Sequence, residues 1–126
     1  MCHLFLIVTA FVESVTGFLL LFLPVIPLEL LLGVSQVAPE TAIVGRVAGA
    51  ALLALGVASW LSRNAEKSRA QHGLLIGLLI YDGIAAALLV YAGLGLNMAG
   101  IALWPAVVLH TALAGWCVAC LRIKSG

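Results

Sequence analysis

The chain has 126 residues, of which 64% are hydrophobic and 9% are charged, and its formal net charge is +1 at pH 7. Soluble domains carry about 25% charged residues, so this composition excludes an ordinary soluble domain and indicates a membrane protein. The length allows about four spanning helices, because each needs about 20 apolar residues. We therefore expect residues 1–126 to form one all-α transmembrane domain that acts within the bilayer or at its two faces.

The first helix is expected over about residues 4–23, an apolar run ended by Pro24 and Pro27, because two prolines so close together cannot continue a helix. No lysine or arginine precedes this run and it holds no small-residue cleavage site, which predicts a retained helix instead of a secretory signal. Residues 28–34 are apolar but too short to span a bilayer. They predict an interfacial segment, with Glu29 toward water.

The remaining spans are expected over about residues 41–61, 73–93 and 101–121. A polar loop of residues 62–72 separates the second helix from the third, and a glycine-rich turn precedes the fourth. Pro105 is tolerated there because it falls in the first helical turn. The predicted architecture is a four-helix transmembrane bundle.

Two patterns of small residues, Gly45-xxx-Gly49 and Gly73-xxx-Gly77, lie in the second and third spans. Glycines four positions apart share one helix face and let a neighbouring helix approach closely. Ordinary packing inside the bundle accounts for both patterns without a dimer. We therefore expect both faces to lie at helix–helix contacts.

The basic residues predict the orientation of the chain. Arg63, Lys67 and Arg69 lie in the loop after the second span, and Arg122 and Lys124 lie in the C-terminal tail. Cytoplasmic loops are enriched in lysine and arginine, so four crossings put this loop and both termini in the cytoplasm. The N-in, C-in arrangement is expected in a bacterial inner membrane. The same distribution gives no support for nucleic-acid binding.

Three ionisable residues, Glu13, Asp82 and His110, fall near the centres of the first, third and fourth spans. Such residues are costly at mid-membrane unless they face protein or water, so each is a candidate functional residue. Thr16 shares the helix face of Glu13, and Tyr81 directly precedes Asp82. The sequence therefore predicts a shared polar centre within the bilayer.

Arg46, in the second span, lies roughly 7 Å to the outer side of the middle of its helix, at about 1.5 Å per residue. Its guanidinium group keeps its charge and, if it points inward, is expected to pair with Glu13 or Asp82. Three interpretations follow: a structural lock between helices, a proton-linked or ligand-binding centre, or residues that face a partner subunit. All three stay open at this point.

Metal and haem binding are not expected. His3 and His72 lie near the cytoplasmic face, too far from His110 to form a pair of haem ligands. A conventional zinc site needs four ligands from cysteine, histidine and carboxylate, which this centre does not supply. The sequence therefore predicts no cofactor and no metal.

Cys117 and Cys120 form a Cys-x-x-Cys pattern that follows Trp116 and resembles a thioredoxin-type redox motif. In such motifs the helix N-terminus stabilises the thiolate, whereas these residues lie in the last turns of the fourth span, where the helix dipole opposes it. Their simpler interpretation is small apolar residues that fill space between helices. They are weak redox candidates.

Residues 10–17, Ala-Phe-Val-Glu-Ser-Val-Thr-Gly, resemble the first helix of the small multidrug resistance transporters. The resemblance implies a four-helix protein in which Glu13 alternately binds protons and cationic drugs. Asp82, Arg46 and His110 have no counterpart in that pattern. Residues 45–56, with the proline-bounded first helix and the basic loop, are similar to small bacterial four-helix membrane proteins, some of them DoxX-like. This second resemblance implies the fold and leaves the activity open.

The leading hypothesis is an integral membrane protein without evident catalytic machinery, either an oligomer or an accessory subunit of a membrane complex. In this hypothesis Glu13, Arg46, Asp82 and His110 form a buried polar network. The expected partners are the lipid bilayer, further copies or other membrane subunits, and a small-molecule ligand.

The first alternative is a proton-coupled small-molecule transporter or binding protein that uses Glu13 or Asp82. The second is a membrane thiol or quinone oxidoreductase that uses Cys117 and Cys120. An enzyme is the less favoured class, and no catalytic residue is assigned.

Overall fold

The computed structural model describes residues 1–66 and 68–125, with side chains as far as Ile123. Its helices are α1 (Cys2–Phe22), α2 (Val25–Leu32), α3 (Pro39–Ser62), α4 (Arg69–Leu94) and α5 (Leu103–Ser125). The helices α1, α3, α4 and α5 are long and apolar enough to cross a membrane. The all-α class and the presence of four spanning helices, both predicted from the sequence, are therefore confirmed.

The two prolines that follow α1 also begin the next helix. Pro24 is the N-cap of α2 and Pro27 falls in its first turn, where the missing N–H would have no partner in the helix anyway. The interfacial segment expected over residues 28–34 is thus the helix Val25–Leu32. Gly33 ends this helix in the left-handed conformation, at φ 67°, which favours glycine.

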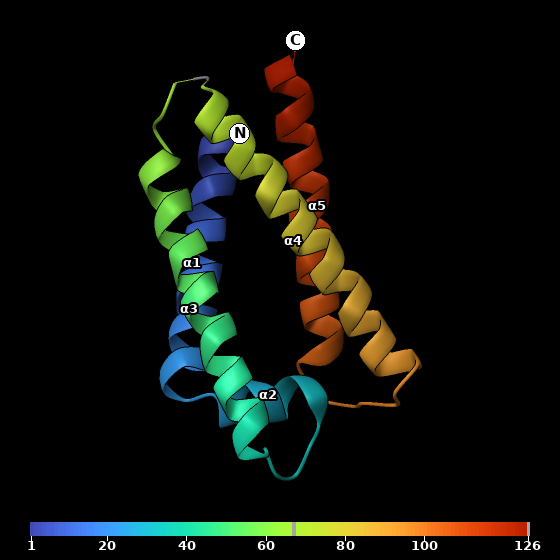
Figure 1. Cartoon of the computed structure of the whole chain (residues 1–126). Coiled ribbons are helices and arrows are strands. Elements are labelled where there is room, and N and C mark those ends of the chain that lie inside the picture. The colour runs from blue at the N-terminus through green and yellow to red at the C-terminus, as the bar shows by residue number, and fades with distance from the viewer. Residues whose placement is uncertain (67, 126) are drawn as a thin grey trace.

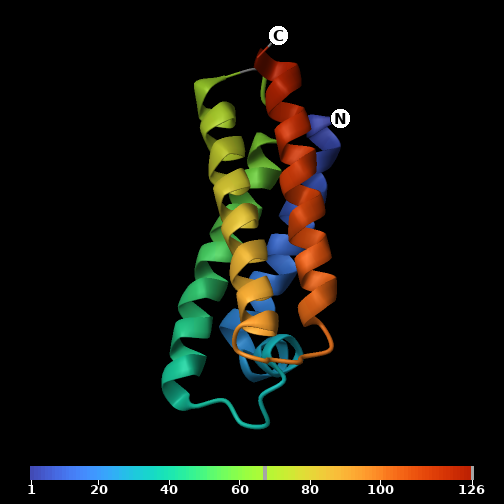
Figure 2. The ribbon, with the colours of Figure 1, turned by 90° about the vertical axis from the view of Figure 1, so that its right-hand side faces the viewer.

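The spanning helices are arranged as two antiparallel pairs. Helix α1 packs most extensively against α3, and α4 packs most extensively against α5. The pairs come together at the end of the bundle that carries both termini, and the α4/α5 pair leans away from α1 and α3 toward the other end (Figure 1). The short helix α2 lies across that second end, below the open side of the bundle (Figures 1 and 2). A pocket lined by residues of α1, α2, α4 and α5 lies at this end.

The end that carries the termini is closed by an apolar core. Its buried side chains come from α1, α4 and α5: Phe5, Leu6, Leu75, Leu78, Leu113, Cys117 and Cys120. The Phe5 ring also meets the Trp116 ring edge-on, with 5.7 Å between the centroids. Burial of this cluster holds the two helix pairs together on one side of the polar residues.

Close contact between α1 and α3 depends on glycine. A Cβ added at Gly17 would lie 2.5 Å from Leu53 N and 2.7 Å from Gly49 O, distances that real Cβ atoms do not reach. The face that begins at Gly45 is therefore a helix–helix contact, as expected. Gly73 and Gly77 differ, because a Cβ at either position would meet nothing within 4 Å. The expectation that this second face packs inside the bundle is wrong.

The basic residues gather at one end of the molecule. Arg63 follows α3, Arg69 begins α4 and Arg122 lies near the end of α5, and these helix ends share one side with both termini (Figure 1). Lys67 and the side chain of Lys124 lie outside the described residues. Arginine side chains are thus concentrated at one end of the bundle, and the predicted N-in, C-in orientation depends on this asymmetry.

Candidate functional site

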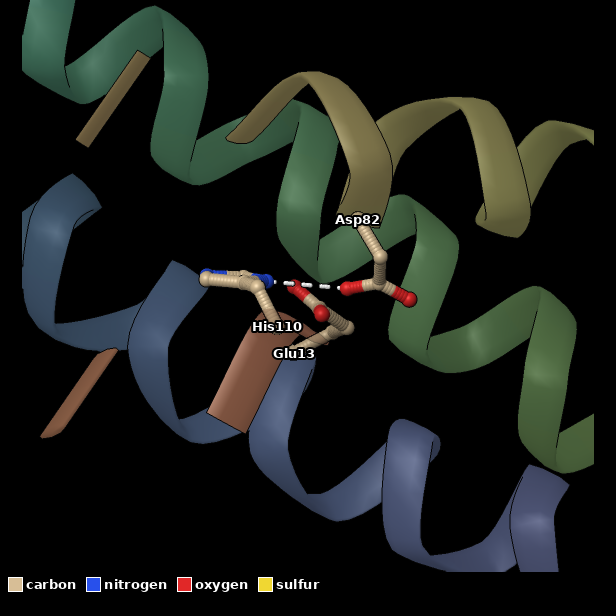
Figure 3. Close-up of side chains that lie close together, drawn as sticks. All are labelled: Glu13, Asp82 and His110. Atoms are coloured by element: carbon tan, nitrogen blue, oxygen red, sulfur yellow. Dashed lines mark hydrogen bonds and ion pairs between the residues drawn. The ribbon is translucent and has the colours of Figure 1, made fainter. Parts of the chain in front are cut away.

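Three polar side chains from three helices converge in the middle of the bundle. Glu13 of α1, Asp82 of α4 and His110 of α5 point toward one another (Figure 3). One oxygen or nitrogen atom of each lies within 4.8 Å of the others. Glu13 is 1% exposed and Asp82 is 0% exposed, whereas the His110 side chain is 14% exposed. The polar centre expected from their common depth is therefore formed by these three residues.

The imidazole of His110 is held from two sides. Its Nδ1–H donates a hydrogen bond to Oδ1 of Asp82, at 2.9 Å. The ring of Tyr81 meets the imidazole edge-on, with 5.6 Å between the centroids and 83° between the planes. These contacts fix the orientation of the ring, so that Nδ1 faces the two carboxyl groups (Figure 3).

The carboxyl groups keep unused acceptor atoms. Oε1 of Glu13 and Oδ2 of Asp82 are both buried and have no hydrogen-bond partner. A buried polar atom without a partner costs about 1–3 kcal/mol, and more when the group is charged. Such atoms are rare in folded proteins, and a bound water, a bound ion or a catalytic role accounts for many of them. The site can therefore accept a hydrogen-bond donor or a cation.

A cavity of about 320 Å³ lies against this centre, between α1, α2, α4 and α5. Ligand sites in proteins typically enclose about 300–1,000 Å³. The polar part of its wall consists of Glu13, Thr16, Tyr81 and His110, and the rest is apolar. The apolar part includes Leu19, Leu30, Leu31, Leu89, Ala106 and Leu109. The site therefore combines an apolar cavity with a polar end.

The contribution of α2 to this cavity was not foreseen. Leu30 and Leu31 form part of the wall, and Leu30 O accepts a hydrogen bond from Ala102 N at 2.9 Å, which ties α2 to the turn before α5. The sequence identified this segment only as an apolar stretch too short to span a bilayer. Such a stretch does not indicate which of its side chains face the bundle.

Arg46 is not brought to this centre. Its side chain is exposed, and Nη1 donates a hydrogen bond to Leu21 O near the end of α1. Helix α3 uses its glycine face to pack on α1, and Arg46 follows Gly45 by one position, about 100° around the helix axis. The polar centre therefore contains three residues from three helices, with no arginine among them.

Cys117 and Cys120 lie elsewhere, in the apolar core at the end that carries the termini. Both are free thiols with 0% exposure, and Sγ of Cys117 donates to Leu75 O at 3.1 Å. Neither residue lines the cavity beside Glu13. The redox candidates and the polar centre are thus separate features of the fold.

Comparison of the chain with protein-family models, with curated proteins and with solved structures finds no match. The resemblances to the small multidrug resistance transporters and to DoxX-like proteins accordingly depend on the residues that carry them.

Proposed function

We propose that this small membrane protein binds a positively charged ligand within the bilayer, at Glu13, Asp82 and His110. The observation that carries the proposal is the state of Glu13, which is 1% exposed, lines the cavity and leaves Oε1 without a partner. Among the described residues, the single ion pair joins Asp82 to His110, so Glu13 has no counter-charge. A buried carboxylate is costly unless it is paired, and a bound cation supplies the missing charge.

The unused oxygens favour this function over a purely structural network. A buried polar network stabilises a fold when every member is satisfied, and is costly when it is only partly satisfied. In this centre Oε1 of Glu13 and Oδ2 of Asp82 are unpartnered. An oligomer or accessory subunit that uses these residues only to hold helices together is therefore the second candidate. A binding protein and a proton-coupled transporter share the binding step that we propose.

The proposal is tested with two cations of different kind, 2-phenylethylammonium and Mn²⁺, added to the purified protein in detergent. We expect at least one of them to bind with a stoichiometry near one per chain in calorimetry, and Glu13→Gln to abolish that binding. Glu40→Gln is the matched control, because Glu40 is exposed at the start of α3. The neutral analogue 2-phenylethanol should bind more weakly than the ammonium ion. Absence of binding by both cations, or equal binding by Glu13→Gln, overturns the proposal.

We also propose that the protein is a multi-pass protein of a bacterial inner membrane with both termini in the cytoplasm. The clustering of Arg63, Arg69 and Arg122 on the side of the termini supports this orientation. In a variant whose own cysteines are replaced by serine, Ser35→Cys should react with a membrane-impermeant maleimide in intact cells. Asn64→Cys should react only after the membrane is permeabilised. The reverse pattern contradicts the orientation.

A further inference from the structure

The spacing of the three site residues matches that of ligands around a metal ion. Ligands at about 2.1 Å on neighbouring corners of an octahedron lie about 3 Å apart, and those on opposite corners about 4.2 Å apart. Nδ1 of His110 and Oδ1 of Asp82 are 2.9 Å apart, as neighbouring ligands would be. All three ligand atoms lie within 4.8 Å of one another, so a shift of at most about 2 Å brings the carboxylate of Glu13 to the spacing of a third ligand.

The charge of the site favours a divalent ion. Coordination through Nδ1 of His110 takes the neutral imidazole and releases the proton that His110 shares with Asp82. Glu13 and Asp82 then supply two uncompensated carboxylates, because Arg46 is engaged with Leu21 O. A divalent cation neutralises both carboxylates, whereas a monovalent cation neutralises only one. Because uncompensated charge is costly in the interior of a membrane protein, the doubly charged ion fits better.

The donor atoms narrow the choice of metal. Imidazole nitrogen suits zinc, copper, iron and nickel, and carboxylate oxygen suits magnesium, calcium and manganese. One nitrogen with two oxygens therefore points to Mn²⁺, Fe²⁺ or Zn²⁺. Mg²⁺ fits less well because it keeps several waters and prefers oxygen ligands alone.

Two further observations separate this group from an ordinary acidic cluster. Oε1 of Glu13, a residue only 1% exposed, is unpartnered, and the carboxyl group is directed at the Asp82–His110 pair (Figure 3). The ring of Tyr81 lies edge-on to the imidazole and restricts its rotation. The three side chains thus lie close together before an ion binds, and coordination at Nδ1 of His110 displaces the proton that it donates to Asp82.

We propose that Glu13, Asp82 and His110 form a mononuclear site for a divalent transition-metal ion, Mn²⁺, Fe²⁺ or Zn²⁺, with further coordination positions facing the cavity. This inference rests on the proposed function and names the class of its ligand. The sequence predicted no metal because four ligands could not be found. Three protein ligands are sufficient where the remaining positions stay open to water or to a small molecule.

The test uses Mn²⁺ on the full-length protein, in detergent, after removal of metal by a chelator and of any polyhistidine tag. We expect one bound Mn²⁺ per chain in equilibrium dialysis, and displacement of it by Zn²⁺. Each of Glu13→Gln, Asp82→Asn and His110→Gln should weaken binding at least about tenfold, the lower limit for loss of a partner that merely orients a ligand. Glu40→Gln and His72→Gln, at exposed positions of the same residue types, should bind as the parent does.

A second measurement needs no variant and covers the case in which a substituted protein does not fold. Pulsed electron paramagnetic resonance of bound Mn²⁺ should show a ¹⁴N coupling from the imidazole of His110. Absence of Mn²⁺ and Zn²⁺ binding, binding without the ¹⁴N coupling, or undiminished binding in all three variants overturns the metal site. If 2-phenylethylammonium binds through Glu13 while the metals do not, the proposed function stands and this inference fails. If no cation binds, both fail.

Discussion

Nδ1 of His110 and Oδ1 of Asp82 lie 2.9 Å apart and form the single ion pair among the described residues. The bond joins α5 to α4 beside a third polar residue, Glu13, that has no such partner. The contact therefore both stabilises the α4/α5 pair and positions an imidazole against a free carboxyl group. These two roles can be measured separately.

A double-mutant cycle isolates the structural role. We expect Asp82→Ala and His110→Ala to show a coupling free energy of about 1–3 kcal/mol, because either single change leaves a buried polar group without its partner. The free energy of unfolding is measured by reversible denaturation with dodecyl sulfate in mixed micelles. Val108→Ala serves as the control second site, since Val108 is 68% exposed. Its effect should add to that of Asp82→Ala within about 0.5 kcal/mol, and coupling no larger than in this control would contradict the prediction.

Glycine-to-alanine changes on the two glycine faces should have different effects on the stability of the protein. A Cβ at Gly49 would lie 2.6 Å from Leu21 N and 2.7 Å from Gly17 O, so Gly49→Ala should force α1 and α3 apart. The expected loss of stability is about 1–3 kcal/mol. Gly77→Ala should be neutral or stabilising by up to about 1 kcal/mol, because the position is open and alanine favours a helix. A destabilising Gly77→Ala that also reduces chemical cross-linking between chains would instead indicate that this face binds a second subunit.

Depth in the membrane could be predicted from the sequence, whereas the rotation of each helix about its axis could not. Glu13, Asp82 and His110 each lie near the middle of an apolar run, which fixes their height, and the structure brings all three together. Arg46 lies toward the outer side of the middle of its helix, and its direction depends on which face of α3 packs against α1. Shape complementarity between the glycine faces determines which face of α3 packs against α1. It is a property of the pair of helices and not of either sequence alone.

The same distinction explains the cavity. An apolar segment after Pro24 predicted that the chain stays near the membrane surface, but not that Leu30 and Leu31 would line the cavity. The direction of α2 is set by contacts with residues about seventy positions away, such as the hydrogen bond from Ala102 N to Leu30 O. The polar end of the site could thus be found from single residues, and its apolar walls could not.

Replacement of Arg46 should leave ligand binding intact. Its guanidinium bonds to Leu21 O, one of the carbonyls at the end of α1 that has no partner within the helix. We expect Arg46→Gln to lower the free energy of unfolding by about 0.5–1.5 kcal/mol through loss of this bond, with an unchanged affinity for the cation that binds at Glu13. Calorimetry on the variant checks the affinity. A tenfold weaker binding would indicate that Arg46 acts on the site after all.

The three thiols should differ in reactivity. Cys117 and Cys120 are fully buried in the apolar core, whereas Cys2 is partly exposed. We therefore expect N-ethylmaleimide to modify Cys2 well before the other two, as followed by mass spectrometry of peptides. Protein unfolded in dodecyl sulfate is the control and should show comparable rates at all three. Fast labelling of Cys117, or a Cys117–Cys120 disulfide after mild oxidation, would favour the oxidoreductase hypothesis.

Filling the cavity should show how much its apolar wall contributes to ligand binding apart from its polar end. Ala106 lines the cavity one helical turn before His110, so Ala106→Phe places a ring in the space that an organic ligand would occupy. We expect this variant to bind 2-phenylethylammonium at least about tenfold more weakly, since the volume is lost while Glu13 remains. Mn²⁺ binding should change much less, because its ligand atoms lie at the end of the cavity and not along its wall.

Ala112→Phe, on the exposed side of the same helix, is the matched control and should alter neither affinity. Equal amine binding by Ala106→Phe and the parent would mean that the organic cation reaches Glu13 by another path, and that the cavity is not its binding site.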